Sequence, residues 1–273
     1  MCDYLIEEFY EEMKSVNLNV WGIIDTNDYI HTLGTDSKII GRIFEMLTQP
    51  VLKRIAERHG MKLTTPAAQT RYPDFIMMTD ANSKEKIAID VKTTYLKKDN
   101  SKISFTLGSY ASYIRDNTKN IEYEYSDYTK HYVIGFVYRR NDEAQESDMI
   151  HYNDRESIKK PYTDVQYFIQ EKYKIAGDKP GSGNTENIGS FSTKSLEDLK
   201  RGRGPFSELG VDVFDIYWKY YPEYRSQDKN YTSLPEFSIW FNEQDQDSIQ
   251  LHHDFSYEGV HVAIERYINT HNT

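Results

Sequence analysis

Cysteine is nearly absent from this chain, since Cys2 is the only one among 273 residues. A single cysteine excludes an intrachain disulfide and a zinc site built on cysteines. Long apolar runs are missing too, and none reaches the roughly 18 residues that a membrane-spanning helix needs. The first residues lack the basic start and the apolar core of a signal peptide. We therefore expect a reduced, cytoplasmic protein with no membrane partner.

A net positive charge is also missing, which at first argues against a nucleic-acid partner. The formal net charge is −10, whereas contact with phosphates needs local lysine and arginine. The acidic excess lies at the two ends, in residues 1–20 and 232–273, and the middle of the chain is neutral. Residues 84–120 carry eight basic side chains against four acidic ones. The distribution of charge therefore still permits a DNA-binding surface.

Apolar and aromatic residues are plentiful enough to build a large folded core. They make up 38% and 14% of the chain, with 23 tyrosines, and this composition argues against disorder. The length suits one large α/β domain with a small appendage. We assign residues 1–231 to a single domain and treat the acidic segment 232–273 as an extension of unknown role. We interpret its four histidines as solvated side chains rather than metal ligands.

The spacing of apolar residues predicts an alternation of helices and strands. One helix is expected over residues 3–14, and a second begins near Thr35 and Asp36, with Pro50 as an interruption or kink. The apolar run 132–138 is typical of a strand buried on both faces of a sheet. Further extended segments are predicted at 19–32, 75–78, 87–95, 103–107 and 165–176, and further helices at 109–118, 195–200 and 211–221.

One predicted β-hairpin carries side chains suited to phosphoryl chemistry. Pro73 and Asp74 precede its first strand, and Asp90 and Lys92 lie within its second. Because side chains alternate along a strand, Asp90 and Lys92 share a face, and Asp74 reaches the same place if the strands pair. Two adjacent carboxylates repel unless a cation intervenes, and oxygen ligands suit Mg²⁺. Lys92 would add positive charge where a phosphoryl transition state gathers negative charge.

The same spacing has a less specific interpretation. A carboxylate and a lysine two residues apart on a strand often form only a solvated polar face. Short motifs of this kind also match by chance. The hairpin pattern alone therefore does not establish a nuclease, and the surrounding sequence has to decide.

Several longer segments, in order from about residue 20 to about 230, match one family far beyond the short motif. They are Leu33–Lys38, Arg42–Glu45, Tyr72–Phe75, Ile87–Tyr95, Phe105–Gly108, Asn117–Ile121, Ile175–Asp178, Gly181–Thr185 and Asn187–Ser190. With these segments the chain resembles the EcoRV family of type II restriction endonucleases. That family is part of the restriction-endonuclease-like superfamily, whose signature is Pro-Asp followed at a distance by (Asp/Glu)-x-Lys.

The resemblance implies a fold, an activity and partners. The fold would be the restriction-endonuclease-like α/β fold, with a mixed central β-sheet flanked by helices. The activity would be Mg²⁺-dependent hydrolysis of both strands of double-stranded DNA, with Mn²⁺ as an expected substitute. The implied site is the palindrome GATATC, cut bluntly at its centre to leave 5′-phosphate ends. The protein would be a homodimer, joined through residues 19–32 and 150–165. A cognate DNA methyltransferase is expected in the host, but not as a physical partner.

The resemblance also implies roles for individual residues in the chemistry. Asp74 and Asp90 would bind the metal, and Lys92 would assist the attacking water and the scissile phosphate. Glu45 corresponds to an acid of the family linked to the metal site. Its place on the predicted helix, nearly opposite the apolar stripe, fits a solvated side chain equally well.

Contacts with DNA are implied at two loops and at scattered polar residues. The segment of Gly181, Ser182, Gly183, Asn184 and Thr185 resembles the major-groove recognition loop, where an asparagine side chain can bond adenine N6 and N7 together. Such a run alone is most often a flexible turn. Gln69, Thr70 and Arg71 correspond to the minor-groove loop. The implied backbone contacts are Lys38, Thr94, Ser112, Lys119 and Arg140.

The sequence departs from the family pattern beside both loops. Ala68 stands where the family has a second glutamine, and Thr70-Arg71 replaces an asparagine-histidine pair. Glu186 places an acid next to the recognition loop where the family has threonine. These differences bear on contacts with DNA, and therefore on the exact site, more than on the chemistry.

Two alternative functions share part of the evidence. A nuclease directed to DNA structure or damage, from the same superfamily, would keep Asp74, Asp90 and Lys92 but would not need the match at Gly181–Thr185. A DNA-binding dimer without catalysis is the second alternative. The complete set of two acids and a lysine argues against it.

Overall fold

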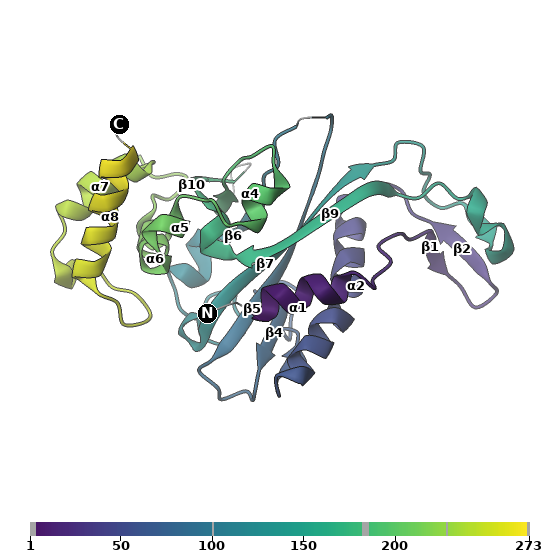
Figure 1. Ribbon diagram of the computed structural model, residues 1–273, viewed down its shortest axis with the longest axis horizontal. Helices are drawn as coiled ribbons and strands as arrows, with labels where there is room; N and C mark the ends of the chain where they lie inside the picture. Colours follow the sequence, from purple (N-terminus) through teal and green to yellow (C-terminus); the bar gives the residue numbers. More distant parts are fainter. Residues whose placement is uncertain (1–3, 100, 182–185, 228, 272–273) are drawn as a thin grey trace.

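The computed structural model describes residues 4–99, 101–181, 186–227 and 229–271. Its centre is a five-stranded sheet (Figure 1) with the strand order β3 (Lys62–Thr64), β4 (Phe75–Met78), β5 (Lys86–Tyr95), β7 (Tyr128–Arg140) and β9 (Tyr162–Glu171). β5 and β7 pair in parallel, and the other neighbours are antiparallel. The predicted α/β fold with a mixed central sheet flanked by helices is therefore confirmed.

Two long helices cover one face of this sheet. They are α1 (Tyr4–Met13) and α2 (Ser37–Arg58), and Phe44 of α2 stacks on Phe136 of β7 with ring centroids 4.4 Å apart. Asp36 caps α2, since its carboxylate accepts hydrogen bonds from the next backbone N–H groups. The predicted interruption at Pro50 is wrong, because the helix continues to Arg58. The buried residues that follow Pro50 hold this turn against the sheet.

The opposite face carries a second small sheet and the remaining helices. The sheet consists of β10 (Ala176–Pro180), β11 (Asn187–Ser190) and β6 (Thr106–Ser109). The helices on this side are α3 (Lys172–Ile175), α4 (Leu196–Lys200), α5 (Phe206–Leu209), α6 (Val211–Tyr220), α7 (Leu234–Asn242) and α8 (Tyr257–His271). Together they bury a second core that includes Phe168, Phe214 and Trp218. Among the described residues, no helix has the length and apolar character that crossing a membrane requires.

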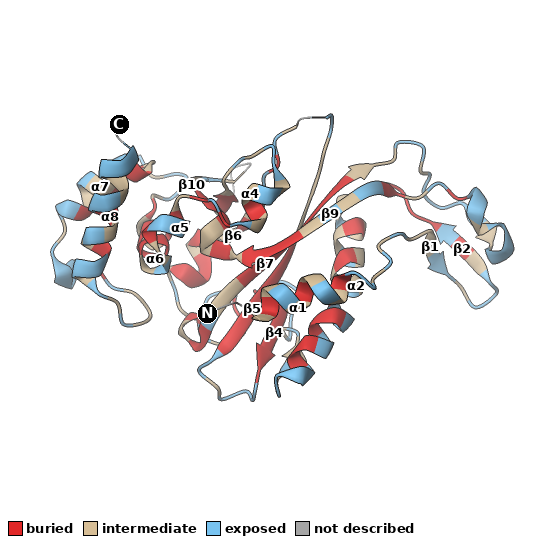
Figure 2. Cartoon of the chain, viewed as in Figure 1, coloured by how far each residue is buried: buried red, intermediate tan, exposed pale blue. Residues whose placement is uncertain are grey.

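The acidic C-terminal segment folds onto this second core. α7, the short η4 (Gln246–Ser248) and α8 bury Phe237, Phe241, Val260 and Ile264. Figure 2 shows that the outward surfaces of α7 and α8 are largely exposed. The acidic charge of the segment therefore lies outside, and its apolar residues extend the core.

A third sheet projects from one end of the molecule, opposite α7 and α8 (Figure 1). It joins β1 (Gly22–Ile24) and β2 (Tyr29–Thr32) to β8 (Met149–His151), which the turn η3 (Tyr152–Ser157) follows. The two segments that the sequence analysis assigned to dimerisation thus meet in one small sheet, although more than a hundred residues separate them.

The structure corrects three of the predicted elements. The predicted strand 103–107 is displaced, because β6 begins at Thr106 and Ile103 only forms an isolated bridge with Thr193. The predicted helix 109–118 shrinks to the irregular turn η1 (Tyr110–Ile114), in which Ser112 leaves the helical conformation. The extended segment predicted to reach residue 176 ends at Glu171, and the helical turn α3 begins at Lys172. In each case packing between distant segments overrides the local apolar pattern.

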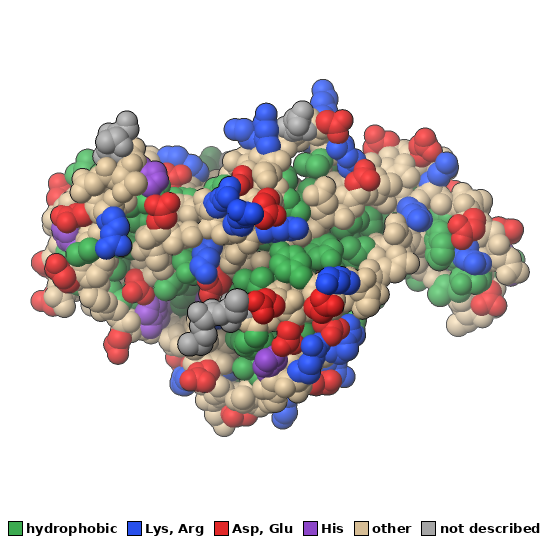
Figure 3. All heavy atoms as spheres, in the orientation of Figure 1, with side chains coloured by type: hydrophobic (Ala, Val, Ile, Leu, Met, Phe, Trp, Pro, Cys, Tyr) green, Lys and Arg blue, Asp and Glu red, His purple; other side chains and the backbone are tan. Residues whose placement is uncertain are grey.

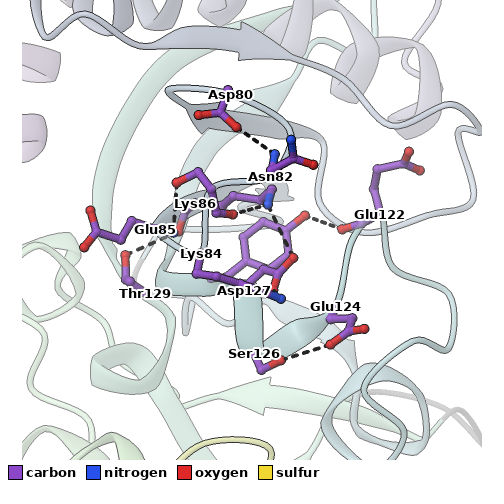
Figure 4. Close-up of polar contacts among 12 residues, drawn as sticks. Asp80, Asn82, Lys84, Glu85, Lys86, Glu122, Glu124, Ser126, Asp127 and Thr129 are labelled. Atoms are coloured by element: carbon purple, nitrogen blue, oxygen red, sulfur yellow. Dashed lines mark hydrogen bonds and ion pairs between the residues drawn. The ribbon is translucent and has the colours of Figure 1, made fainter.

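An ion cluster fixes the turn of the β4–β5 hairpin to the residues just before β7. Figure 4 shows Lys84 and Lys86 directed toward Asp127 of η2 (Tyr125–Asp127). Lys86 is fully buried, and its Nζ lies 3.3 Å from Asp127 Oδ2 and 4.3 Å from the ring centroid of Tyr123. This cluster ties the hairpin turn to its neighbouring strand, and it therefore helps to set the register of β5.

Candidate active site

The β4–β5 hairpin brings Asp74, Asp90 and Lys92 together, as the sequence predicted. Phe75 pairs with Ile89, so Asp74 follows in register opposite Asp90. Asp74 Oδ2 accepts a hydrogen bond from Val91 N at 2.7 Å, and Lys92 Nζ lies 2.6 Å from Asp90 Oδ2. Ile87, Ile89 and Val91 pack into the core on the α1–α2 side, as strand alternation requires.

Burial and charge perturb all three side chains. Burial, reinforced by the charge of Asp90, raises the pKa of Asp74 to about 8. Burial also acts to raise the pKa of Asp90, but the ammonium groups of Lys92 and Lys172 outweigh it and leave this pKa below its usual range. Burial acts to lower the pKa of Lys92, whereas the two carboxylates raise it above its usual value. At neutral pH the trio therefore holds an ionised Asp90, a protonated Lys92 and a proton on Asp74.

The two carboxylates fit a divalent cation. Asp90 Oδ2 is buried beside the ammonium of Lys92, and the carboxylate of Asp74 lies opposite it on the neighbouring strand. The proton that Asp74 retains is one that a cation could displace. Mg²⁺ prefers oxygen ligands and accepts sites in which one or two carboxylates are completed by water and phosphate. No group of three or more histidine, cysteine or acidic side chains suited to a metal occurs in the described part of the chain, so water and substrate would have to complete the coordination.

Two adjoining hollows form a groove beside this trio, and Asp74 and Lys92 line it. The first has a volume of about 830 Å³ and extends from Lys38 and Thr94 past Lys92 to Gly181. The second has a volume of about 500 Å³ and extends to Asp74 and the loop with Gln69 and Arg71. The groove thus joins residues that the sequence analysis assigned to chemistry, to backbone contact and to both recognition loops.

Glu45 and Arg42 of α2 line both hollows. Their side chains form an ion pair, with Arg42 Nη1 2.6 Å from Glu45 Oε2. Glu45 therefore lies on the wall of the groove that Asp74 and Lys92 also line. Arg42 was missed by the sequence analysis. The signal that could have identified it is its spacing of three residues from Glu45, which places both side chains on one side of a helix.

Other predicted DNA contacts lie apart from the linings of these hollows. Ser112 is buried, and its hydroxyl donates a hydrogen bond to the carbonyl of Lys119 at 2.8 Å. The exposed Lys119 Nζ donates to the carbonyl of Ala111 at 3.0 Å. Arg140 stacks over the ring of Tyr95 at 3.7 Å and donates to Ser37 Oγ at 2.6 Å. Contact between DNA and Ser112 would therefore require a local rearrangement.

At both places where the sequence departs from the family pattern, an acidic side chain makes a contact within the protein. Arg71 forms an ion pair with Glu122 at 3.0 Å, while Ala68, Gln69 and Thr70 are exposed. Glu186 accepts a hydrogen bond from Tyr224 N at 3.0 Å, so its carboxylate is engaged within the protein. In the predicted recognition loop Gly181 is described, and Ser182, Gly183, Asn184 and Thr185 lie outside the described residues.

Comparison with known proteins decides the family. The family model of restriction endonuclease EcoRV matches residues 13–242. The type II restriction enzyme EcoRV of Escherichia coli is 43% identical over 240 residues, which cover 86% of this chain and 95% of the relative. The chain belongs to the EcoRV family of restriction endonucleases.

Membership in the EcoRV family makes the chain a type II restriction endonuclease. Among solved structures, the NlaIV restriction endonuclease matches over 94% of both chains, with 10% identity and a TM-score of 0.39. This likeness is too distant to carry an argument. The EcoRV family model ends at residue 242, so helix α8 (Tyr257–His271) lies outside the region that it matches.

The raised pKa of Asp74 predicts a pH-dependent stability of the metal-free protein. The pKa rises from an ordinary value of 3.8 to about 8 on folding, so the folded state binds the extra proton. That stabilisation is complete below the unfolded pKa and is lost as pH rises toward 8. In the presence of EDTA, the free energy of unfolding relative to Asp74→Asn should fall between pH 5 and pH 8. Urea unfolding measures this free energy. A difference between the two proteins that does not change with pH would contradict the raised pKa of Asp74.

Proposed function

We propose that this restriction endonuclease uses Mg²⁺, or Mn²⁺ as a substitute, to hydrolyse both strands of double-stranded DNA at a short palindrome. The observation that carries the proposal is the meeting of Asp74, Asp90 and Lys92 at one groove, which Asp74 and Lys92 line while Asp90 is buried behind them. Asp74 and Asp90 would hold the metal. Glu45 lines the same groove and would join them only after its side chain moves closer, because the described residues hold no cluster of three acids suited to a metal. When bound, Mg²⁺ would polarise a phosphoryl oxygen and lower the pKa of a coordinated water.

The remaining chemistry is assigned to the chain's own side chains. Lys92 presents an ammonium in the groove, where it would stabilise the negative charge that develops on the scissile phosphate. Asp90 holds this ammonium at 2.6 Å. The backbone N–H of Val91 holds Asp74, so the carboxylate is oriented before any ligand binds. This preorganisation reduces the rearrangement that the transition state would otherwise require.

We infer that the site is GATATC, cut at its centre to leave blunt ends with 5′-phosphates. The match of Gly181–Thr185 to the family recognition loop and the 43% identity to EcoRV support this inference. Gly181 N donates a hydrogen bond to Asn187 O at 2.8 Å, and Gly181 lines the groove. The easily deformed central TA step would add selectivity through DNA bending.

Sequencing the ends of digested plasmid DNA tests this function. With Mg²⁺ we expect blunt ends at the centre of GATATC, and with EDTA we expect intact plasmid. Cuts at a different palindrome would overturn the proposed site but keep the proposed chemistry. Nicks that depend on DNA junctions or lesions would favour the structure-directed nuclease. Specific DNA binding without cleavage would favour the alternative of a DNA-binding dimer that lacks catalysis.

We also propose a homodimer that acts in the cytoplasm, joined through the β1–β2–β8 sheet. Ile23, Ile24 and Met149 of this sheet are 65%, 52% and 60% exposed, and Figure 3 shows hydrophobic side chains at this end of the molecule. Exposed apolar patches mark interaction surfaces. A two-fold dimer would match a palindromic site, with each subunit cutting one strand. A cognate DNA methyltransferase is expected in the host, without physical association.

Ile23→Glu should convert this dimer to monomers, because it places a charge in the apolar interface. Light scattering after size-exclusion chromatography measures the mass. Ile239→Glu is the matched control, since Ile239 is equally exposed, at 65%, but lies on α7 at the other end. A dimeric Ile23→Glu protein, or a monomeric control, would contradict the proposed interface.

A further inference from the structure

Lys172 has a buried ammonium group close to the catalytic carboxylates. The residue is 2% exposed and begins α3, directly after β9. Asp90 of β5 pairs with Val133 of β7, and Val133 pairs with Gln170 of β9. Lys172 follows Gln170 by two residues. Asp90, Val133 and Gln170 therefore lie side by side across three strands, and Lys172 comes two residues after the last of them.

The contacts of Lys172 lead to the segments that carry the active site. Its Nζ donates a hydrogen bond to Tyr113 Oη at 3.0 Å and lies 3.9 Å from the ring centroid of Tyr72. The rings of Tyr72 and Tyr113 stack with centroids 4.3 Å apart. Tyr72 precedes Asp74 by two residues. The Lys172 ammonium therefore contacts both the residues that precede β4, through Tyr72, and the turn η1, through Tyr113.

Packing alone does not account for a lysine at this position. Within the described part of the chain, Lys172 forms no ion pair, and its partners are a hydroxyl and two aromatic rings. An ammonium group buried without a carboxylate partner costs stability. Burial lowers the pKa of Lys172 to about 7, and the strongest opposing influence is the charge of Asp90. Lys172 therefore interacts electrostatically with Asp90, although it forms no ion pair of its own among the described residues.

We propose that Lys172 is a positioning residue of the active site, whose buried ammonium holds the Tyr72–Tyr113 pair next to the segment of Asp74 and adds positive charge near the two carboxylates. The inference rests on the proposed function, because it assigns those carboxylates to a divalent cation. Its consequence is twofold. Lys172 keeps the carboxylates in place for turnover, and its charge competes with the incoming cation.

The test compares Lys172→Met, Lys172→Arg and the control Lys174→Met in the full chain. Lys174 belongs to the same helical turn but is partly exposed and paired with Glu171. The first readout is the rise in unfolding temperature as Mg²⁺ is titrated without DNA, which reports metal binding independently of activity. The second is the split between kcat and KM for plasmid cleavage.

We expect Lys172→Met to require several-fold less Mg²⁺ for half of the thermal stabilisation, because a competing positive charge is gone. Its kcat should fall about tenfold with little change in KM, as for other residues that orient metal ligands. Lys172→Arg should retain the Mg²⁺ dependence of the wild type, and Lys174→Met should match the wild type in both readouts.

Two results would overturn the proposal. One is a Lys172→Met protein whose Mg²⁺ requirement is unchanged or increased, because that outcome, with or without a lower kcat, indicates a purely structural lysine. The other is a Lys172→Arg protein that behaves like Lys172→Met. If the wild type leaves DNA intact at every Mg²⁺ concentration, the proposed function fails, while the thermal titration still tests Lys172.

Tyr113→Phe covers the case in which Lys172→Met does not fold. This variant removes only the hydroxyl that accepts the Lys172 hydrogen bond and keeps the stacked ring. We expect a folded protein with a kcat lowered about threefold, within the range of one lost hydrogen bond. An unchanged kcat in this variant would overturn the positioning role.

Discussion

Lys92→Ala and Asp90→Asn should each lower the rate of DNA cleavage by about 1000-fold or more while leaving a folded protein that binds DNA. Lys92 would stabilise charge that develops only in the transition state, and losing one such group typically costs two to three orders of magnitude. Asp90→Asn keeps the shape of the side chain but removes the charge that holds Lys92 at 2.6 Å and would bind the metal. Single-turnover cleavage of plasmid DNA with Mg²⁺ measures the rate.

Lys84→Ala is the matched control for these two variants. Lys84 belongs to the same hairpin, but it lies in the turn that precedes β5, its side chain is 71% exposed and it pairs with Asp127. Lys86 still pairs with the buried Asp127 in this variant, so the protein should stay folded and cleavage should remain normal. Normal plasmid cleavage by Lys92→Ala or Asp90→Asn would refute the assignment of the active site.

Phe241→Ala should lower the free energy of unfolding by about 3–5 kcal/mol, the usual cost of emptying a buried aromatic site. Phe241 is fully buried at the end of α7, and its ring stacks on Tyr257 of α8 with centroids 5.1 Å apart. Phe241 lies within the region that the EcoRV family model matches, and it packs against α8, which lies outside that region.

Urea unfolding of Phe241→Ala and Ile239→Ala checks this expectation. Ile239 belongs to the same helix but is 65% exposed, so its substitution should change the free energy of unfolding by no more than about 0.5 kcal/mol. Equal stabilities of the two variants would show that α7 and α8 contribute little to the core. A large loss confined to Phe241→Ala would instead make residues 234–271 an integral part of the fold.

The catalytic trio was predictable because its geometry is local. The polar turn and the two apolar segments specify a hairpin, and strand alternation then places Asp90 and Lys92 on one face. Asp74 follows from the register of the same hairpin. The buried strand β7 was predictable for a similar reason, since its apolar run is continuous.

Elements whose conformation depends on distant partners were predicted less well. The irregular turn η1 holds Ser112 through the carbonyl of Lys119, and β6 pairs with β11, which lies about eighty residues further along the chain. Local apolar spacing carries no record of such pairings, so the helix 109–118 and the strand 103–107 were misplaced. The strand that ends at Glu171 was extended too far for the same reason.

By itself, the sequence determined the hairpin, the alternation along β5 and the family, because each of these depends on residues close together in the chain or on a direct match of residue types. Only the tertiary structure decided which distant side chains surround the trio. It placed Arg42 and Glu45 on the groove wall, buried Lys172 near Asp90 and packed α8 onto the core. Those positions follow from contacts between segments far apart in the chain, whose free energy depends on the packing of the whole fold rather than on any local pattern.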